Sequence, residues 1–262
     1  MKVLIKLGGT LIDNSESLAG LSVQLAALPA QGIHAVVVHG GGKQMTRYLA
    51  ERGVESKFVN GLRVTSPDVI DAVLKVFTGS VNKQLVSSLV AAGAPAVGIS
   101  GIDAALTEAR QLDPTLGAVG EIIRTNPALL EVLAQNGFLP VVACVAGDRH
   151  GNVYNVNADQ MAVACATGYR ADRLLFLTDV DGVRDGSGTT LSVLTASAAR
   201  DLIESGAATG GMQAKLHSAC AALAGGVREV IIAPGAAAGI IQRLLAGETV
   251  GTRLVPDPEV IA

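Results

Sequence analysis

The sequence predicts an α/β protein in which helices cover both faces of a mostly parallel sheet. Two patterns lead to this prediction. Short runs rich in β-branched residues alternate with longer segments whose apolar residues recur every three or four positions, as amphipathic helices require. The short runs are apolar on both faces, which is typical of parallel strands buried between helices.

The expected strands are bounded by turn residues and enriched in Val, Ile and Leu. In chain order they are residues 3–7, 35–39, 96–100, 139–145, 173–179 and 229–234. Helical segments lie between them, including SLAGLSVQLAALPAQ, NPALLEVLAQNG, ADQMAVACATG and MQAKLHSACAALAGG. Residues 181–191, DGVRDGSGTTL, predict a β-hairpin or loop.

No Pro/Ser-rich linker divides the chain, so any lobes must share the sheet. A polar, turn-forming stretch at 146–151 marks a soft boundary. We therefore expect an N-terminal lobe over 1–150 and a C-terminal lobe over 151–262.

Composition excludes several classes of protein. The chain has 262 residues, 49% of them hydrophobic and 16% charged, which suits a compact domain with a large core. Its net charge is −3 and no basic block occurs, which argues against nucleic-acid binding. The N-terminus does not resemble a signal peptide, and no apolar run of about 18 residues predicts a membrane span. Three cysteines in apolar surroundings (Cys144, Cys165, Cys220) favour reduced core thiols in a cytoplasmic protein.

Two glycine-rich loops follow neighbouring expected strands: Gly8–Gly9 after the first, and Gly40–Gly42 within VVVHGGGKQM after the second. A P-loop is excluded because Val37 and Gln44 occupy positions that need Gly and Ser or Thr. An esterase oxyanion loop is excluded because no GxSxG follows. The loops serve either as tight turns or, facing each other, as a trough of backbone N–H donors for phosphate oxygens.

Two lysines and one aspartate stand out. Lys6 ends an otherwise apolar strand, where a cation without a function is costly. Lys215 is the single lysine after residue 84, although ten arginines occur there. Asp159 lies at the start of an apolar helix behind Asn157, a good N-cap. A carboxylate between two lysines would hold both near one phosphate, whereas Lys43 is expected to be solvated and without chemical role.

The sequence resembles the amino acid kinase family through ordered blocks along nearly the whole chain. These are KLGG (6–9), VHGGG (38–42), NGLRVT (60–65), GSVNK (79–83), LGAVGEI (116–122), GFLPVV (137–142), NVNADQ (155–160), LLFLTDVDGV (174–183), GGMQAK (210–215) and GTRL (251–254). The resemblance implies a three-layer αβα sandwich with a mainly parallel open sheet and two lobes, the amino acid kinase fold.

The resemblance also implies a reaction. The N-terminal lobe would bind an acyl amino acid and the C-terminal lobe ATP with Mg²⁺, held mainly by the ATP phosphates. The γ-phosphoryl group would pass to the side-chain carboxylate of N-acetyl-L-glutamate, giving N-acetyl-L-glutamyl 5-phosphate in arginine biosynthesis. No general base is needed, because the nucleophile is already an anion.

By the same resemblance, the site residues carry separate roles. Lys6 and Lys215 would stabilise the transition state, Asp159 would orient them, and Gly9 and Gly41 would donate N–H groups. The substrate would contact Gly41, Gly42, Arg63 and Asn155. The adenine and ribose site would comprise Thr178, Asp179, Val180, Asp181, Gly182 and Val183, with Ala207, Ala208, Thr209 and Gly211 nearby.

Other members of the family leave alternatives open. The segment GISGIDAALTEAR is less polar than the GKDGG-like run common in the family, so the acyl group stays open, N-succinylglutamate included. Kinases of carrier-protein-linked aminoadipate or glutamate are disfavoured by the intact NGLRVT and the few basic residues. A ligand-binding module without turnover is disfavoured because all three charged residues are present. The chain starts at its first strand, which favours an arginine-insensitive homodimer formed by helices such as 66–90.

Overall fold

The computed structural model describes residues 1–258, and the last four residues of the expected C-terminal lobe lie outside this range. Its centre is an eight-stranded sheet in the order β12-β14-β13-β11-β1-β2-β8-β5, in which only the β13–β14 pair is antiparallel. The strands are β1 (Lys2–Leu7), β2 (His34–His39), β5 (Ala96–Ser100), β8 (Leu139–Ala143), β11 (Arg173–Thr178), β12 (Val193–Thr195), β13 (Glu229–Pro234) and β14 (Thr252–Val255). The mainly parallel open sheet expected from the sequence is confirmed.

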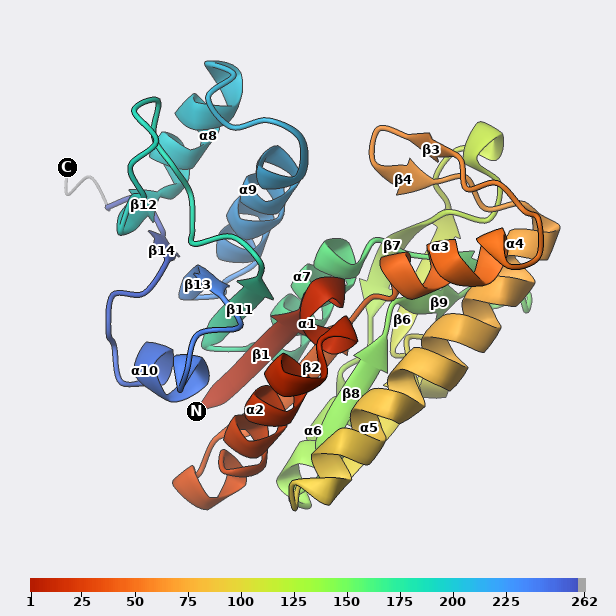
Figure 1. Ribbon diagram of the computed structural model, residues 1–262, viewed down its shortest axis with the longest axis horizontal. Helices are drawn as coiled ribbons and strands as arrows, with labels where there is room; N and C mark the ends of the chain where they lie inside the picture. Colours follow the sequence, from red (N-terminus) through yellow and green to blue (C-terminus); the bar gives the residue numbers. More distant parts are fainter. Residues whose placement is uncertain (259–262) are drawn as a thin grey trace.

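Helices cover the sheet on both faces (Figure 1). They are α1 (Gly9–Asp13), α2 (Ser15–Ala26), α3 (Gly42–Ala50), α4 (Pro67–Val73), α5 (Asn82–Ala91), α6 (Ala128–Gln135), α7 (Ala158–Tyr169), α8 (Ala196–Glu204), α9 (Gly210–Ala224) and α10 (Ile240–Leu245), with short 3₁₀ turns η1 (Pro29–Gln31), η3 (Asp103–Ala105) and η4 (Pro114–Leu116). Helix α2 packs against α5 and α10 on one face, and α7 packs against α9 on the other.

The centre of the sheet is fully buried because neither face meets water. Val3, Leu4, Ile5 and Leu7 of β1 are each 0% exposed. Burying such side chains contributes about 1.5–3 kcal/mol each, and the helices on the two faces supply the partners. The apolar runs in the sequence therefore mark the strands correctly.

The expected helix at 66–90 is one continuous helix with an irregular middle. α4 leads into a π-helical segment, η2 (Leu74–Val81), and then into α5. π-helical turns are rare and frequent at functional sites. This one brings Phe77 against the loop after β2.

A second, four-stranded sheet has the order β10-β9-β6-β7. It contains β6 (Thr107–Gln111), β7 (Gly120–Thr125), β9 (Val145–Gly147) and β10 (Val153–Asn155). Residues between β9 and β10 form a tight turn in which Asp148 accepts from the N–H groups of His150 and Asn152. The expected lobe boundary at 150/151 thus falls in a turn whose two strands pair with each other.

Two hairpin-like loops project from the body. β3 (Phe58–Val59) and β4 (Leu62–Arg63) form a small hairpin near α3 (Figure 1). In the segment 181–191, Arg184 and Thr190 form an antiparallel bridge, and the Asp185 carboxylate accepts from the backbone of the turn. The segment is therefore a hairpin-like loop, in agreement with the β-hairpin or loop expected from the sequence.

Candidate active site

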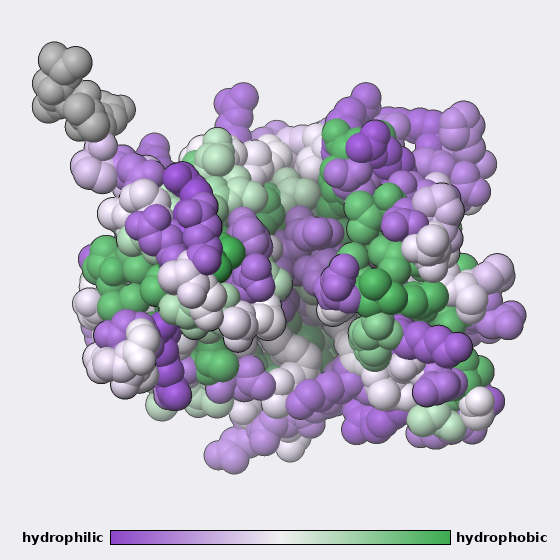
Figure 2. Space-filling view, turned by 90° about the horizontal axis from the view of Figure 1, so that it is seen from above, coloured by the Kyte–Doolittle hydropathy of each residue, from purple (hydrophilic) through white to green (hydrophobic). Residues whose placement is uncertain are grey.

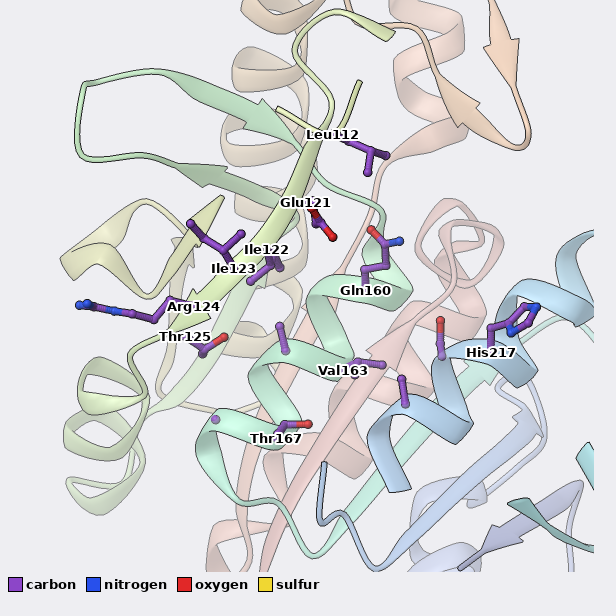
Figure 3. A pocket seen from close by; sticks show the side chains of 14 residues that line it. Leu112, Glu121, Ile122, Ile123, Arg124, Thr125, Gln160, Val163, Thr167 and His217 are labelled. Carbon is purple, nitrogen blue, oxygen red and sulfur yellow. The ribbon is translucent and has the colours of Figure 1, made fainter. Parts of the chain in front are cut away.

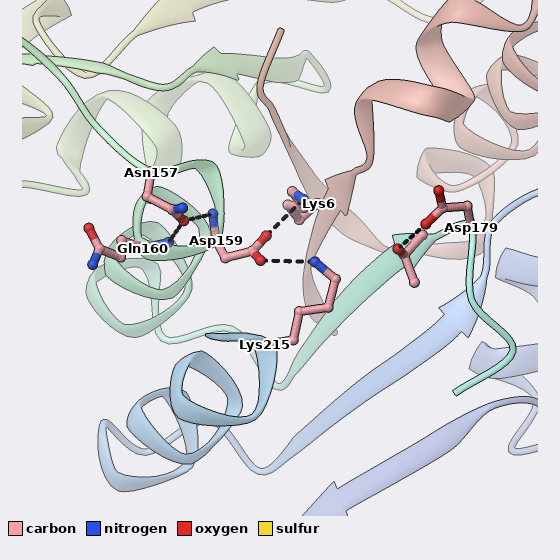
Figure 4. A network of polar contacts seen from close by, with 7 residues as sticks. Lys6, Asn157, Asp159, Gln160, Asp179 and Lys215 are labelled. Carbon is pink, nitrogen blue, oxygen red and sulfur yellow. Dashed lines mark hydrogen bonds and ion pairs between the residues drawn. The ribbon is translucent and has the colours of Figure 1, made fainter. Parts of the chain in front are cut away.

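Three charged side chains from distant parts of the chain meet beyond the carboxyl end of β1 (Figure 4). Nζ of Lys6, on β1, lies 2.7 Å from Oδ1 of Asp159, at the start of α7. Nζ of Lys215, on α9, lies 3.1 Å from Oδ2 of the same carboxylate. The three side chains are 11%, 9% and 17% exposed, in the order Lys6, Asp159, Lys215. Each carboxylate oxygen thus holds one lysine.

The cluster carries a net positive charge in a nearly dry place. Burial by itself would raise the pKa of Asp159. The attraction of Lys6 and Lys215, together with their hydrogen bonds, lowers the pKa by more than burial raises it, so the pKa lies below its usual value. The carboxylate is therefore ionised at neutral pH. One negative and two positive charges leave a surplus of one, which favours an anion beside the cluster.

Local structure fixes Asp159. The side chain of Asn157 accepts hydrogen bonds from the backbone N–H groups of Asp159 and Gln160 at 2.9 and 3.3 Å, which caps α7. The cap holds the first helical turn, and with it the carboxylate, opposite the end of β1. Asn157 is thus the N-cap that the sequence predicts.

The two glycine loops lie at the ends of the adjacent strands β1 and β2. A Cβ at Gly41 would lie 2.7 Å from Cδ1 of Phe77, so packing alone requires glycine there. Apart from chain neighbours and the backbone of its own helix, no atom of residues 1–258 lies within 4 Å of a Cβ placed at Gly9 or Gly42. The space at these two positions is open, which suits the close approach of a ligand to the backbone.

Figure 2 looks down on this end of the sheet and shows a hollow between the two halves, lined mainly by hydrophilic residues. Lys43, in the first turn of α3, is exposed to solvent, as expected. The carboxyl ends of strands are where open α/β sheets bind ligands.

Arg63 and Asn155 lie on the side of the second sheet and the small hairpin. Arg63 is 6% exposed; its Nη2 donates to Gly42 O at 3.0 Å and to Thr46 Oγ1 at 2.9 Å, and its Nη1 donates to Ser56. Within residues 1–258, three of its five N–H donors are thereby engaged and two stay available. Nδ2 of Asn155 donates to Oγ1 of Thr65 at 3.1 Å.

The residues expected at the nucleotide follow β11. Thr178 is buried and donates to Oδ1 of Asp179 at 3.1 Å, while Thr10 donates to Oδ2 at 3.2 Å. The pKa of Asp179 is lowered because these hydrogen bonds, with its backbone and Lys43, outweigh partial burial. Val180 and Asp181 are exposed. Asp179 thus links the end of β11 to the first turn of α1, which follows β1.

Other expected nucleotide residues are packed into the protein. Val183 is 0% exposed and donates its N–H to Thr252 Oγ1 at 2.8 Å. Gly182 has a φ of 145°, and a Cβ there would lie 2.7 Å from the same oxygen, so it needs glycine. Ala208 is buried, with its N–H bonded to Leu202 O. Ala207, Thr209 and Gly211, which are also expected near the nucleotide, are exposed and lie at the start of α9 or just before it.

Sequence reasoning missed several partners of these residues, among them Thr10, Ser56, Thr65 and Phe77. Each acts through a contact with a residue at least seven positions away in the sequence. Two of them had a signal in the sequence: Thr10 follows Gly8–Gly9 directly, and Thr65 ends the block NGLRVT.

A cavity of about 700 Å³ lies on the other side of the helices that carry Asp159 and Lys215, between β7, α7 and α9 (Figure 3). Gln160 and His217 line it, and they follow Asp159 and Lys215 closely in sequence. Lys6, Asp159 and Lys215 are not among its lining residues. Charge rather than size therefore marks the candidate active site.

The fold and the charged cluster define a class. The chain belongs to the amino acid kinase family, whose model matches residues 1–234. Acetylglutamate kinase of Solibacter usitatus (strain Ellin6076) is 65% identical over 255 residues, covering 97% of this chain and 99% of that protein. Acetylglutamate kinase of Acidobacterium capsulatum is 42% identical over 258 residues, with coverage of 97% and 99%.

Solved structures agree on the fold. N-acetylglutamate synthase from Neisseria gonorrhoeae, complexed with coenzyme A and N-acetyl-glutamate, superposes with a TM-score of 0.87 at 28% identity. The match covers 98% of this chain and 60% of that one, so this chain spans less than two thirds of the synthase. Carbamate kinase from Giardia superposes with a TM-score of 0.73 at 16% identity, a likeness of fold alone.

Proposed function

We propose that this protein transfers the γ-phosphoryl group of ATP to the side-chain carboxylate of N-acetyl-L-glutamate, giving N-acetyl-L-glutamyl 5-phosphate, a step of arginine biosynthesis. The observation that carries the proposal is the Lys6–Asp159–Lys215 cluster, which has a surplus positive charge and lies at the end of β1, where the two glycine loops follow β1 and β2. The 65% identity to an acetylglutamate kinase supports the choice of substrate.

The residues present suit a reaction that needs charge stabilisation and placement. The attacking carboxylate is already an anion, so no side chain has to remove a proton. Lys6 and Lys215 neutralise charge on the transferring group from two sides, and Asp159 keeps them apart and in place. The N–H groups of Gly9 and Gly41 donate to its oxygens. Removing one such donor typically costs about 10²–10³-fold in rate.

The acyl amino acid lies between the second glycine loop and the second sheet. Gly42 leaves room for the backbone to approach it. The free donors of Arg63 suit the α-carboxylate, and Asn155 supplies an amide beside Thr65. Arg63 also holds Gly42 O, so it couples substrate binding to the geometry of the loop.

ATP lies on the side of β11 and α9. Exposed Asp179, Val180 and Asp181 contact the nucleoside, with Ala207, Thr209 and Gly211 beside it, while Thr178, Gly182, Val183 and Ala208 shape the wall behind them. No group of three or more metal-ligating side chains occurs in the described part of the chain, and both oxygens of Asp159 face lysines. We expect Mg²⁺ to be held mainly by the ATP phosphates, as is usual for this ion, where it would neutralise phosphate charge.

The division of labour follows the two lobes, 1–150 for the acyl amino acid and 151–262 for ATP. The working unit is a homodimer, with the α4–η2–α5 helix at the interface; Val90 on this helix is 54% exposed. The protein acts in the cytoplasm. Within the described residues, no helix is both long and apolar enough to cross a bilayer.

The alternative is a kinase of a different acyl amino acid or of a carrier-linked amino acid. The apolar loop around Ile102 is the reason to test this alternative. Ile102 is 39% exposed, beside Ala104 and Ala105, where a polar loop would contact an acyl group differently. N-succinylglutamate and carrier-bound aminoadipate or glutamate are the substrates to compare.

Purified protein with ATP, Mg²⁺ and hydroxylamine tests the proposal, because hydroxylamine traps an acyl phosphate as a hydroxamate. We expect product with N-acetyl-L-glutamate at the highest kcat/KM of the panel. Product with another acyl amino acid only would overturn the substrate assignment. Lys215→Ala should lower kcat by at least about 10²-fold, and a wild-type rate in this variant would overturn the mechanism.

A further inference from the structure

His39 ends β2 and is wholly buried, although it precedes the loop at the candidate active site. Its Nδ1 lies 2.7 Å from Gly40 O, and its Nε2 lies 3.0 Å from Nδ2 of Asn82, the first residue of α5. A buried imidazole with both ring nitrogens engaged is held in one orientation. The reaction proposed above gives this side chain no part.

The contacts of Asn82 determine which nitrogen of His39 carries the proton. Lys83 Nζ donates to Oδ1 of Asn82 at 3.1 Å, and Nδ2 of Asn82 donates to Val141 O at 2.9 Å. An ammonium can only donate and a carbonyl can only accept, so the amide has one allowed orientation. Nδ2 therefore donates to Nε2 of His39 as well, and the imidazole proton must lie on Nδ1.

The Nδ1–H group of His39 in turn fixes a peptide plane. It donates to Gly40 O, the carbonyl of the peptide that joins Gly40 to Gly41. In a planar trans peptide the C=O and N–H point in opposite directions. Holding Gly40 O toward His39 therefore directs the N–H of Gly41 away from it.

The N–H of Gly41 has no acceptor within residues 1–258, although Gly41 is buried. Buried backbone donors are almost always paired, so this one is available for a partner that residues 1–258 do not supply. Its carbonyl, by contrast, starts α3 by accepting from Met45.

We propose that His39 is a positioning residue: in the tautomer set by Asn82, it holds the Gly40–Gly41 peptide so that the N–H of Gly41 faces the transferring phosphoryl group. The inference rests on the proposed function, which gives Gly41 its role as a donor. His39 itself does not touch substrate.

The packing around Asn82 holds its side chain in place for the contact with His39. A Cβ on Gly98 of β5 would overlap Oδ1 of Asn82 and lie 2.7 Å from Nζ of Lys83. Lys83 also donates to Gly98 O at 3.2 Å. The path from β5 through Asn82 and His39 to the loop is therefore closely packed at each step.

The first test reads the tautomer without reference to activity. The protein has four histidines, so ¹⁵N-histidine spectra of the wild type and His39→Asn identify the His39 signal. We expect Nδ1 protonated and Nε2 unprotonated at neutral pH. The opposite tautomer, or a doubly protonated ring, would overturn the proposal.

The second test compares two substitutions whose amides each replace one ring nitrogen of His39. The shorter amide introduced by His39→Asn reaches the position of Nδ1, and the longer amide introduced by His39→Gln reaches the position of Nε2. We expect His39→Gln to lower kcat by about 10–100-fold while both KM values change less than about threefold. His39→Asn should recover at least tenfold of that loss, with both variants folded by circular dichroism.

Three outcomes separate the possibilities. Wild-type kcat in folded His39→Gln, or equal losses in the two folded variants, would overturn the positioning role. If the wild-type enzyme forms no acyl phosphate with N-acetyl-L-glutamate, the proposed function fails. In that case the same two variants are compared with whichever acyl amino acid the wild type phosphorylates.

Discussion

Nζ of Lys6 lies 2.7 Å from Oδ1 of Asp159, so the end of a buried strand and the first turn of a helix share an ion pair that is almost closed to water. Neither partner is stable there alone, since an unpaired buried charge costs several kcal/mol. Lys215 occupies the second oxygen. The arrangement therefore depends on the carboxylate.

Removing that carboxylate should abolish most of the activity. In Asp159→Asn the two lysines lose the charge between them and repel each other, so we expect kcat to fall by at least about 10²-fold. The hydroxamate assay measures it. Asp201→Asn, an exposed carboxylate on α8, is the matched control and should keep the wild-type rate; a comparable rate in both variants would contradict the ordering role.

Adding a methyl group at Gly41 should disturb packing at Phe77. The new Cβ would lie 2.7 and 2.8 Å from two ring carbons of Phe77, so we expect Gly41→Ala to cost about 1–3 kcal/mol of unfolding free energy. Urea denaturation measures this cost. In the Phe77→Leu background the same change should cost less, whereas Gly42→Ala, with open space around it, should alter stability by less than about 0.5 kcal/mol. Equal costs of Gly41→Ala in both backgrounds would rule out this contact.

Arg63 should matter for the acyl amino acid and not for ATP. Lysine cannot reproduce the planar fork of arginine, so Arg63→Lys should raise KM for N-acetyl-L-glutamate by about tenfold or more. We expect KM for ATP to stay within about twofold. Arg52→Lys changes an arginine that is 52% exposed and should leave both constants unaltered. A rise confined to the KM for ATP would refute the assignment.

Replacing either of two alanines in the loop after β5 by glycine should raise the stability of the protein. Ala104 and Ala105 have φ of 50° and 51°, in the left-handed region where a Cβ costs about 1–2 kcal/mol. Gly removes that cost but adds freedom to the unfolded chain, so each single substitution should raise stability by about 0.5–1 kcal/mol. Thermal melts measure the change. Ala19→Gly, at an exposed position within α2, should lower stability instead.

Stability should fall on mild acidification because of His39. Burial is the main cause that lowers the pKa of His39 from 6.5 to about 4, although its bond to Gly40 opposes this. Between these values the unfolded chain binds a proton that the folded chain excludes, so stability is fully present above 6.5 and declines toward 4. From pH 7 to 5 the loss from this residue is about 2 kcal/mol.

His39→Asn isolates this effect, since its other titratable groups are those of the wild type. Urea denaturation at pH 7 and 5 should show a smaller pH dependence in the variant by about 2 kcal/mol. An identical pH dependence in the two proteins would show that His39 does not titrate differently on folding.

The sequence predicts the framework well where patterns are local. All six expected strands are present within one or two residues, because short apolar runs rich in β-branched residues and bounded by turns favour buried parallel strands. Lys6 and Asp159 were found for a related reason: a charge inside an apolar element requires a partner. Asn157 caps α7 as its side-chain chemistry predicts.

The second sheet and the small β3–β4 hairpin were not predicted. Strands such as β6, with the sequence TEARQ, are short and polar, and their pairing is decided by neighbouring strands rather than by intrinsic preference. The positions of Val183 and Ala208 were likewise not predictable. Val183 bonds to Thr252, which is distant in the sequence, and the bond of Ala208 to Leu202 follows no sequence pattern.

The sequence by itself determined the apolar strands at the centre of the sheet, the glycine turns and the need of Asp159 for cations, because periodicity, backbone freedom and charge burial act residue by residue. Only the tertiary structure decided that Phe77 demands glycine at 41 and that Asn82 selects the proton position on His39. Both depend on a side chain from one helix reaching one particular strand end, and no local pattern encodes that contact.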